Sequence, residues 1–399
     1  MSFDVERAPR PARGDAQILA ALFLLAGTGI AALYSASYGY AQALGKAPEH
    51  FVMRQGVFAL AGLIVFLVSA RLPLARLRSA SAVITIAGIA LLVLPFLPGI
   101  GVHRNGAARW FQVAGQTFQP SEAWKLVAIL YLAHIFDKKA DRMGDAVNAA
   151  LPPLLLVALG TGLVYAQNDF STSVLIGVSA LAVFWAAGTP VSFFAAMASL
   201  AAPLAALSVL TSDFRLKRII SFAFPTHQSE SIGYQVAAST RAIASGGFLG
   251  KGIGLGTLKA SSVPDIHADF IVAAIGEEAG FLGVLALAAL WAWFAWRGFR
   301  VAFRSEGRYE SLLAFGLSVS LALQALVNVA VASGSVPATG IPLPFFSAGG
   351  SSLLSSACAA GLLYNLSRGV ATAGVESEAD ADTSRALPAY AIGAEARRG

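Results

Sequence analysis

Charged residues are scarce in this sequence of 399 residues. They make up 13% of the chain, whereas hydrophobic residues make up 56%, and a soluble domain usually carries about 25% charged residues. This shortage excludes a water-soluble fold. Apolar stretches of about twenty residues recur along almost the whole length, each long enough to cross the hydrocarbon of a bilayer, so we expect one polytopic membrane domain.

Cysteine is also almost absent, because Cys358 is the only one. No intramolecular disulfide can therefore form, and cysteine usage says nothing about the redox compartment. A continuous basic face or tail is lacking too: the formal net charge is +6, but the Lys and Arg residues stand in short clusters between apolar segments. Membrane topology explains such clusters, so no nucleic-acid partner is expected.

Windows of about twenty residues on a hydropathy scale predict about ten transmembrane spans. The expected fold class is an all-α polytopic membrane protein, with a cytoplasmic tail over 1–15, a transmembrane domain over 16–370 and a cytoplasmic tail over 371–399 whose composition indicates disorder. The first run follows a basic tail as a signal peptide does, but it extends towards Tyr40, which favours an uncleaved first span. The spans are expected near residues 16–38, 51–70, 79–99, 121–137, 146–165, 171–188, 190–211, 270–296, 309–333 and 349–368.

Basic residues stand before the first expected span and follow the second, fourth and eighth. Because cytoplasmic loops carry the excess of Lys and Arg and the number of spans is even, this alternation predicts that both termini are cytoplasmic. The outward loops include two long segments, 100–120 and a large extracytoplasmic loop over 212–269 between the seventh and eighth spans. Long segments of this kind are often functional. The basic clusters are Arg7, Arg10 and Arg13, then Arg71, Arg76 and Arg78, then Lys138, Lys139 and Arg142, and finally Arg297, Arg300, Arg304 and Arg308.

The segment SVPDIHADFIVAAIGEEAGFLG (262–283) carries acids into the eighth span. Asp269 lies at the outer membrane boundary, where partial desolvation would make a carboxylate a better proton acceptor, although an aspartate at a helix start is often only an N-cap. Glu277 and Glu278 lie about two turns deeper. Ionisable groups at that depth are costly, so they either act directly or pair with a buried cation such as Lys125.

The segment HRNGAARWFQVAGQTFQPSEAWK (103–125) is the second polar cluster. It places Arg109, Trp110 and Gln119 in an outward loop. In the next span, Glu122 and Lys125 are three residues apart and can share a helix face. The alternatives are structural: the PSE sequence is typical of a helix start, and an isolated tryptophan at this level is often an interfacial anchor.

Two further outward segments are rich in glycine. In IASGGFLGKGIGLG (243–256), glycines would let backbone amides approach a phosphate while Lys251 supplies charge. The spacing is not that of a Walker loop, and a flexible turn is the alternative. In SGSVPATGIPLPFFSAGGSS (333–352), irregular backbone cannot face lipid, so it must pack against protein or line a polar cavity. Asp169, between the fifth and sixth spans, adds a further acid.

Taken in order, these motifs resemble the SEDS family, which includes FtsW, RodA and SpoVE. The matching features are NG and RW followed by QPSE and K, then YQ, SGG and GKG, HxDFI with GEE and GF, and TGxPLPF with GGSS, over about residues 15–370. The forms GYQV (233–236) and SGGFLGKG (245–252) are more similar to the division branch, FtsW, than to the elongation branch, RodA. Three departures are Asn168 where the family usually has Pro, Ser171 where it usually has Gly, and Ala268 where it usually has Thr.

The resemblance implies an enzyme, a peptidoglycan glycosyltransferase that polymerises lipid II into glycan strands during cell division or elongation, on the outer face of the bacterial cytoplasmic (inner) membrane. Asp269 would then be the general base of an inverting transfer. The implied partner is a class B penicillin-binding protein transpeptidase, FtsI-like or its elongation counterpart, beside other divisome or elongasome proteins. No cofactor is firmly implied, although a divalent cation such as Mg²⁺ could share the phosphate charge. The residues expected to bind substrate are Arg109, Trp110, Gln119, Glu122, Lys125, Asp169, Arg241, Lys251, His267, Glu277 and Ser351.

Two other functions fit the same residues. A transporter that moves lipid II across the membrane would use the intramembrane charges Glu277, Glu278 and Lys125 as a translocation path. A scaffold that only activates a partner transpeptidase would not need Asp269 for synthesis. Polymerisation of lipid II by the purified protein distinguishes the enzyme from both alternatives.

Overall fold

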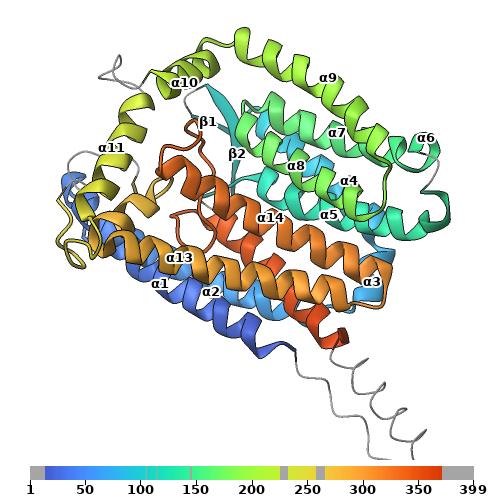
Figure 1. Ribbon diagram of the computed structural model, residues 1–399, viewed down its shortest axis with the longest axis horizontal. Helices are drawn as coiled ribbons and strands as arrows, with labels where there is room; N and C mark the ends of the chain where they lie inside the picture. The colour runs from blue at the N-terminus through green and yellow to red at the C-terminus, as the bar shows by residue number, and fades with distance from the viewer. Residues whose placement is uncertain are drawn as a thin grey trace, which may run out of the picture.

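The chain folds into a bundle of long helices that run roughly alongside one another (Figure 1). The computed structural model describes residues 14–104, 106–113, 115–143, 146–224, 232–257 and 266–370. Among these residues, five helices are long and apolar enough to cross a membrane. They are α1 (Ala16–Ala43), α2 (His50–Ser69), α9 (Val191–Leu210), α13 (Ile271–Arg304) and α14 (Arg308–Ala332).

Five further helices complete the bundle in the described part of the chain, so the prediction of about ten membrane helices is confirmed. The short elements α3 (Leu74–Ser79), η2 (Ala140–Arg142) and α6 (Ala146–Ala149) lie in the connections between them. The five helices are α4 (Ser81–Val93), which the 3₁₀ turn η1 (Leu94–Phe96) continues, α5 (Pro120–Lys138), α7 (Leu151–Ala166), α8 (Phe170–Ala186) and the last helix (350–370).

The helices of the bundle approach closely where one of them carries a glycine. A Cβ atom at Gly160 on α7 would lie 2.1 Å from the ring of Trp124, a fully buried side chain of α5. At Gly361 on the last helix, a Cβ atom would lie 2.6 Å from the backbone oxygen of Phe66 on α2. Small residues at such positions let membrane helices pack backbone to backbone, which replaces the hydrophobic driving force that lipid does not supply.

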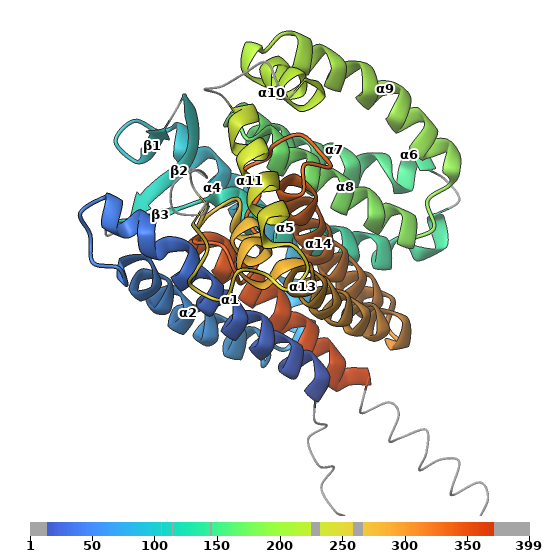
Figure 2. The ribbon, with the colours of Figure 1, turned by 60° about the vertical axis from the view of Figure 1, so that its left-hand side comes forward.

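Helix α9 differs from the others because it lies along the edge of the bundle (Figures 1 and 2). Within the described residues, only about one residue in twenty of its apolar window is buried. Apolar side chains that no protein covers are stable where lipid covers them, which fits a membrane-spanning helix. Four leucines, Leu200, Leu204, Leu207 and Leu210, are each more than half exposed.

The start of α1 and the end of the last helix meet at one end of the bundle. The backbone N–H of Asp15, the N-cap of α1, donates to Ser367 Oγ at 2.9 Å. The Asp15 carboxylate also accepts from Arg297 near the end of α13. These contacts hold three helix ends together and place both ends of the transmembrane domain on the same side, as an even number of spans requires.

The segment predicted as a plain outward loop, 100–120, contains a small antiparallel sheet with the strand order β1-β2-β3. Its strands are β1 (Gly101–Arg104), β2 (Ala107–Val113) and β3 (Gln116–Phe118). Gly106 and Gly115, with φ of 74° and 77°, stand between the strands. The sequence signal was present, because the Asn-Gly pair at 105–106 is typical of a tight hairpin turn. The hairpin was not expected because transmembrane hydropathy is the stronger signal along this sequence.

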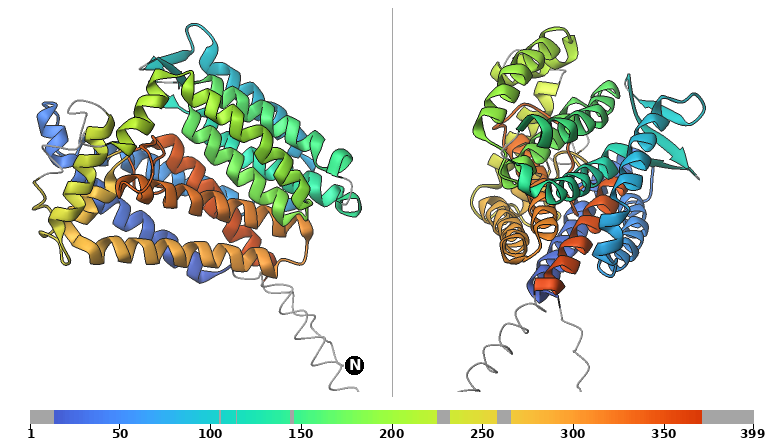
Figure 3. Two further views of the ribbon diagram at one scale, coloured as in Figure 1. Left: turned by 45° about the horizontal axis from the view of Figure 1, so that its top comes forward. Right: turned by 90° about the vertical axis from the view of Figure 1, so that its right-hand side faces the viewer.

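The large outward loop also contains regular structure in its described part. α10 (Asp213–Ala223) turns across the outer end of α9, and α11 (Ile232–Gly246) returns towards α13, against which it packs (Figures 1 and 3). The loop therefore covers the outer end of the bundle near the start of α13. Asp265, an acid of the segment 262–283, and the tail 371–399 lie outside the described residues.

Candidate functional site

Asp269 lies just before α13 and lines a cavity of about 400 Å³ at the outer end of the bundle. Its backbone oxygen accepts a hydrogen bond of 3.0 Å from Asn328 Nδ2 on α14. The same amide group donates to Ile341 O at 2.8 Å. Asn328 is buried, so it ties the turn at Asp269 to the glycine- and proline-rich loop. The Asp269 side chain is half-buried, and its Oδ2 lies 3.8 Å from the place that a Cβ atom on Gly340 would take.

Four of the residues predicted to bind substrate line the same cavity: Trp110, Gln119, His267 and Ser351. They come from β2, the start of α5, the turn before α13 and the last helix, which are far apart in sequence. The Gln119 backbone N–H donates to Ser351 Oγ at 3.0 Å. The His267 ring packs against two aromatic rings, with centroid distances of 4.7 Å to Tyr40 and 4.5 Å to Phe51.

A polar network around Asp169 joins this cavity to the sheet. Gln119 Nε2 donates to Asp169 Oδ2 at 2.8 Å, and Arg109 Nη1 lies 3.9 Å from Asp169 Oδ1. Arg109 also donates to the backbone oxygen of Asn168, and Asn168 Nδ2 donates to Gly106 O at 2.8 Å. The turn between α7 and α8 is thereby fixed against the hairpin.

The backbone of Asn168 explains one departure from the family pattern. Its φ is 61°, a left-handed conformation that asparagine tolerates better than most residues. The proline that the family usually has at this position fixes φ near −65° and cannot adopt this turn. Asn168 therefore fits the left-handed turn beside Asp169, and it supplies the amide that donates to Gly106 O.

A second cavity, of about 340 Å³, lies on the other side of Gly340, which lines both cavities. Three arginines line it, Arg109, Arg215 and Arg218, together with Asp169. We call it the arginine cavity. Arg215 and Arg218 are not among the residues predicted from the sequence to bind substrate. Their signal was the run of cations in an outward loop, against the usual distribution, with the spacing of three residues that shares a helix face.

Arg218 is held at the wall of the arginine cavity by the glycine- and proline-rich loop. Its Nη1 donates to Ala338 O at 3.2 Å, and its guanidinium lies 4.5 Å from the centre of the Phe214 ring. Burial lowers the pKa of Arg218, and the positive charge of Arg109 lowers it further, whereas Asp269 and Asp169 raise it. Arg218 therefore interacts electrostatically with charged residues of both cavities.

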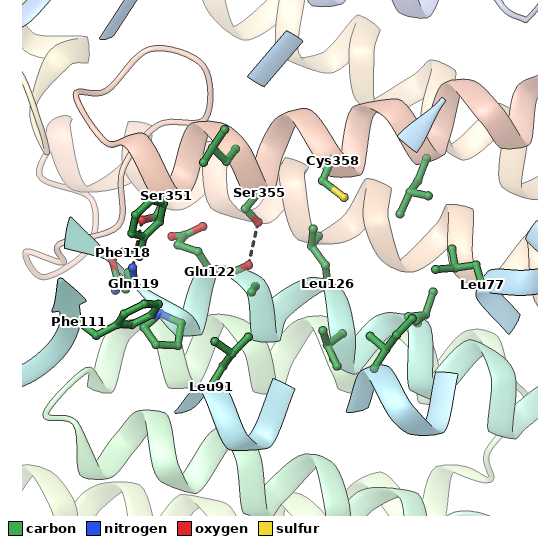
Figure 4. Close-up of a pocket in the computed structure, with 17 residues that line it drawn as sticks. Leu77, Leu91, Phe111, Phe118, Gln119, Glu122, Leu126, Ser351, Ser355 and Cys358 are labelled. Carbon is green, nitrogen blue, oxygen red and sulfur yellow. Dashed lines mark hydrogen bonds between the residues drawn. The ribbon is translucent and has the colours of Figure 1, made fainter. Parts of the chain in front are cut away.

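An apolar groove of about 390 Å³ leads away from the Asp269 cavity between α4, α5 and the last helix (Figure 4). Gln119 and Ser351 line both the groove and the Asp269 cavity. The polar side chains Gln119, Glu122 and Ser351 gather at one end, whereas Leu77 and Cys358 lie towards the other (Figure 4). The groove therefore joins a polar site to an apolar channel within the membrane part of the bundle.

Glu122 and Lys125 form a buried pair on α5. Lys125 Nζ lies 2.7 Å from Glu122 Oε2, each side chain is 5% exposed, and Lys125 also donates to Gln324 Oε1 on α14 at 2.5 Å. Lys125 is thus paired within its own helix. The alternative that it neutralises Glu277 or Glu278 is wrong in its choice of partner, because Lys251 lies 2.8 Å from Glu277.

The glycine-rich segment binds α13 with the groups that were expected to face a phosphate. Lys251 Nζ and Thr257 N donate to Glu277 Oε1 at 2.8 and 2.9 Å. Gly254 N donates to Glu278 Oε1 at 3.0 Å. The backbone N–H groups of residues 251 and 252 donate to backbone oxygens of α13. We call residues 246–257 with Glu277 and Glu278 the glycine clasp, since four of its backbone N–H groups donate to α13.

The glycines of the clasp are required by space and by backbone angle. Gly250 has φ of 83°, and a Cβ atom there would lie 2.1 Å from Glu278 O. Gly280, with φ of 64°, interrupts α13, and a Cβ atom there would lie 2.4 Å from Gly250 N. Two backbones therefore meet with no room for side chains between them.

Arg241, like Lys125 and Lys251, is a predicted substrate-binding cation that lines none of these three cavities. It lies on α11, where its Nε donates to Ala237 O at 3.2 Å and its guanidinium lies 5.8 Å from the centre of the Tyr234 ring. Its contacts are thus within its own helix. Among the described residues, no group of three or more His, Cys, Asp and Glu side chains is placed to hold a metal ion.

The profile of the FtsW/RodA/SpoVE family, described as "Cell cycle protein", matches residues 16–371 of the chain. The chain belongs to this family. A protein of Geobacter sulfurreducens named "Probable peptidoglycan glycosyltransferase FtsW" is 36% identical over 355 residues, covering 89% of this chain and 95% of that protein. A protein of the same name from Trichlorobacter lovleyi is 36% identical over 361 residues, covering 90% and 95%.

Solved structures of family members have the same fold. One is described under "Structural coordination of polymerization and crosslinking by a peptidoglycan synthase complex", with a TM-score of 0.74, 25% identity and coverage of 90% of this chain and 98% of that one. The rod shape determining protein RodA of Thermus thermophilus gives a TM-score of 0.66, 26% identity and coverage of 89% and 97%.

Proposed function

We propose that this chain is a peptidoglycan glycosyltransferase that polymerises lipid II into glycan strands, of the FtsW rather than the RodA branch. Relatives that share its whole transmembrane domain carry that activity in their names. The observation that carries the proposal is the position of Asp269, whose carboxylate lies on the wall of a polar cavity that joins an apolar groove. A lipid-linked sugar needs both environments at once.

The chemistry assigned to Asp269 is that of a general base. It removes the proton from the 4-hydroxyl of the acceptor sugar, whose oxygen attacks the anomeric carbon of the donor and inverts it. Trp110 and Gln119, on the same cavity, orient the acceptor. The polyprenyl chain of the acceptor lies in the apolar groove, whose far end is lined by residues such as Leu77 and Leu362. Placing a base within hydrogen-bond reach typically contributes about 10²- to 10⁴-fold in rate.

The site belongs on the outer face of the bacterial cytoplasmic membrane, with both termini in the cytoplasm. Clusters of Lys and Arg follow the second, fourth and eighth spans, on the side where α1 begins and the last helix ends. Asp269 lies at the opposite ends of the helices. Because lipid II presents its sugars outside the cytoplasm, a polymerase needs its base on that side.

A class B penicillin-binding protein is the proposed partner. The similar solved structure is described as a synthase complex that coordinates polymerization and crosslinking. A transpeptidase that acts on new strands works best beside the enzyme that makes them, since the polymer then passes directly between the two sites.

The decisive experiment compares purified wild-type protein with Asp269→Asn, each with its cognate transpeptidase and labelled lipid II, and separates the products on a gel. Wild type is expected to give glycan ladders and Asp269→Asn only background, with both proteins equally folded by thermal melting. Ladders of equal intensity from the variant would refute the assignment of Asp269. No ladder from either protein would support transport of lipid II or a scaffold function instead.

A further inference from the structure

We propose that the arginine cavity binds the diphosphate of the donor lipid, which is the leaving group, while the Asp269 cavity binds the acceptor sugar. This inference rests on the proposed polymerase function and deepens it, because it assigns the two lipid-linked substrates to two different cavities. The ligand class is a polyprenyl diphosphate.

The arginine cavity is positively charged. Three guanidinium groups line the arginine cavity, Arg109, Arg215 and Arg218, and Asp169 is the one acid among its lining residues. Asp169 lies 3.9 Å from Arg109. The cavity thus carries a net charge of about +2 by ordinary protonation states. Arginine is the side chain best suited to phosphate because its planar fork donates two parallel hydrogen bonds.

Two of the arginines are positioned by neutral groups. Arg215 Nη1 donates to Tyr165 Oη at 2.7 Å and to Ser208 Oγ at 2.6 Å. Arg218 donates to Ala338 O, and its buried Nε makes no hydrogen bond within the described residues. Neutral partners orient a guanidinium without cancelling its charge. Both groups therefore keep their attraction for an anion.

The remaining wall of the arginine cavity is mostly apolar. Below the arginines the cavity is lined by aliphatic side chains from α8 and α14: Val174, Val178, Leu323 and Val327. An inorganic anion needs no such surface, whereas a polyprenyl chain attached to a diphosphate does. The cavity thus matches an amphipathic ligand with its charge at the outer end.

The arginine cavity and the Asp269 cavity meet at Gly340. Gly340 lines both, and it has no side chain between the Asp269 carboxylate and the arginine cavity. An anomeric carbon whose diphosphate lies with the arginines can therefore meet a hydroxyl that Asp269 deprotonates. The acceptor oxygen then forms a bond to that carbon, and its proton goes to Asp269. The bond from the carbon to the diphosphate oxygen breaks, and its electron pair remains on the diphosphate, whose added negative charge the arginines stabilise.

The other cations of the outward loop are less suitable for this task. Lys251 lies 2.8 Å from the fully buried carboxylate of Glu277. Arg241 contacts its own helix and lines neither cavity. The arginine cavity is therefore a better candidate site for the leaving group than Lys251 or Arg241.

The test is the binding of undecaprenyl diphosphate to the full-length protein in lipid nanodiscs. Arg218→Gln is expected to weaken binding about tenfold or more, because it removes a charge-assisted contact. Arg218→Lys keeps the charge and is expected to fall between the two. Lys217→Gln is the matched control, since it removes an exposed cation one residue away on the same helix. Equal binding by wild type and Arg218→Gln overturns the proposal, and equal weakening by Lys217→Gln overturns it as well.

A second variant and a second probe keep the test independent of folding defects at Arg218. Val178→Trp fills the aliphatic part of the cavity. It is expected to weaken undecaprenyl diphosphate and to leave inorganic diphosphate unchanged. If inorganic diphosphate binds as tightly as the lipid to wild type, the cavity is a free-anion site and the assignment to the donor lipid is overturned.

The failure of this inference is distinguishable from the failure of the proposed function. Glycan ladders from wild type with no effect of Arg218→Gln on undecaprenyl diphosphate binding leave the polymerase standing and overturn the donor site. Binding that depends on Arg218 in a protein that makes no glycan supports a lipid diphosphate site and rejects the polymerase.

Discussion

Lys251 and Arg218 lie in the same outward segment between α9 and α13, yet their surroundings are opposite. Lys251 is paired at 2.8 Å with Glu277, a carboxylate with no exposed surface. Arg218 is held by a backbone oxygen and a ring. A cation opposite a buried acid serves the fold, because separating the pair would leave an uncompensated charge. A cation held by neutral groups retains its charge for a ligand.

A large effect is expected from breaking the glycine clasp at Gly250. Gly250→Ala would require a left-handed φ of 83° and a Cβ atom 2.1 Å from Glu278 O. Backbone strain and overpacking together should cost about 2–5 kcal/mol. The free energy of unfolding in mixed detergent micelles measures it. Gly27→Ala on α1 is the control, since a Cβ atom there meets nothing within 4 Å. Equal stability of the two variants would show that the clasp does not constrain the fold.

The pair Glu122 and Lys125 extends the comparison to a cation inside the membrane. Lys125→Met leaves Glu122, 5% exposed, as an uncompensated buried charge and should cost about 3–5 kcal/mol. The double variant Glu122→Leu with Lys125→Met should recover most of that loss, because no charge remains. Unfolding free energies of the two single variants and the double variant form the cycle. A double variant less stable than Lys125→Met would contradict a purely structural pair.

The smallest effect on stability is expected at Ser351, which lines the Asp269 cavity. Ser351→Ala removes the acceptor of the Gln119 backbone N–H, a hydrogen bond of 3.0 Å. The net loss should be about 1 kcal/mol of stability. Gln119 also donates to Asp169. The rate of polymerisation should therefore fall by a larger factor in Ser351→Ala than in the control variant Ser355→Ala. Ser355 Oγ donates to Glu122 O on the same pair of helices. Identical rates in the two variants would remove Ser351 from the site.

Much of the fold was predictable because membrane hydropathy is a strong signal. A bilayer demands about twenty apolar residues per helix and internal hydrogen bonding, so the spans follow from composition alone. The sheet at β1 to β3 was missed, since strands outside the membrane carry a weaker signal. The site was predictable where a motif places a polar residue at a helix start, as for Asp269 and Gln119.

The partners of the charges were not predictable from spacing. Lys251 and Glu277 are 26 residues apart in sequence, and only the turn at Gly280 and the glycines before it bring them together. Likewise, Arg215 and Arg218 are three residues apart and can share a helix face, but this spacing alone does not place them at a cavity. Their position beside Gly340 depends on the path of α10 across the end of the bundle.

The single glycine between the two cavities, Gly340, has a consequence for processive growth. After each transfer the lengthened strand is attached to the lipid that arrived as acceptor, and the spent carrier occupies the arginine cavity. Before the next cycle the carrier must depart and the strand's new reducing end must change sides. Because Gly340 lines both cavities and carries no side chain, that translocation step is short, so the polymer can advance by one disaccharide without leaving the enzyme.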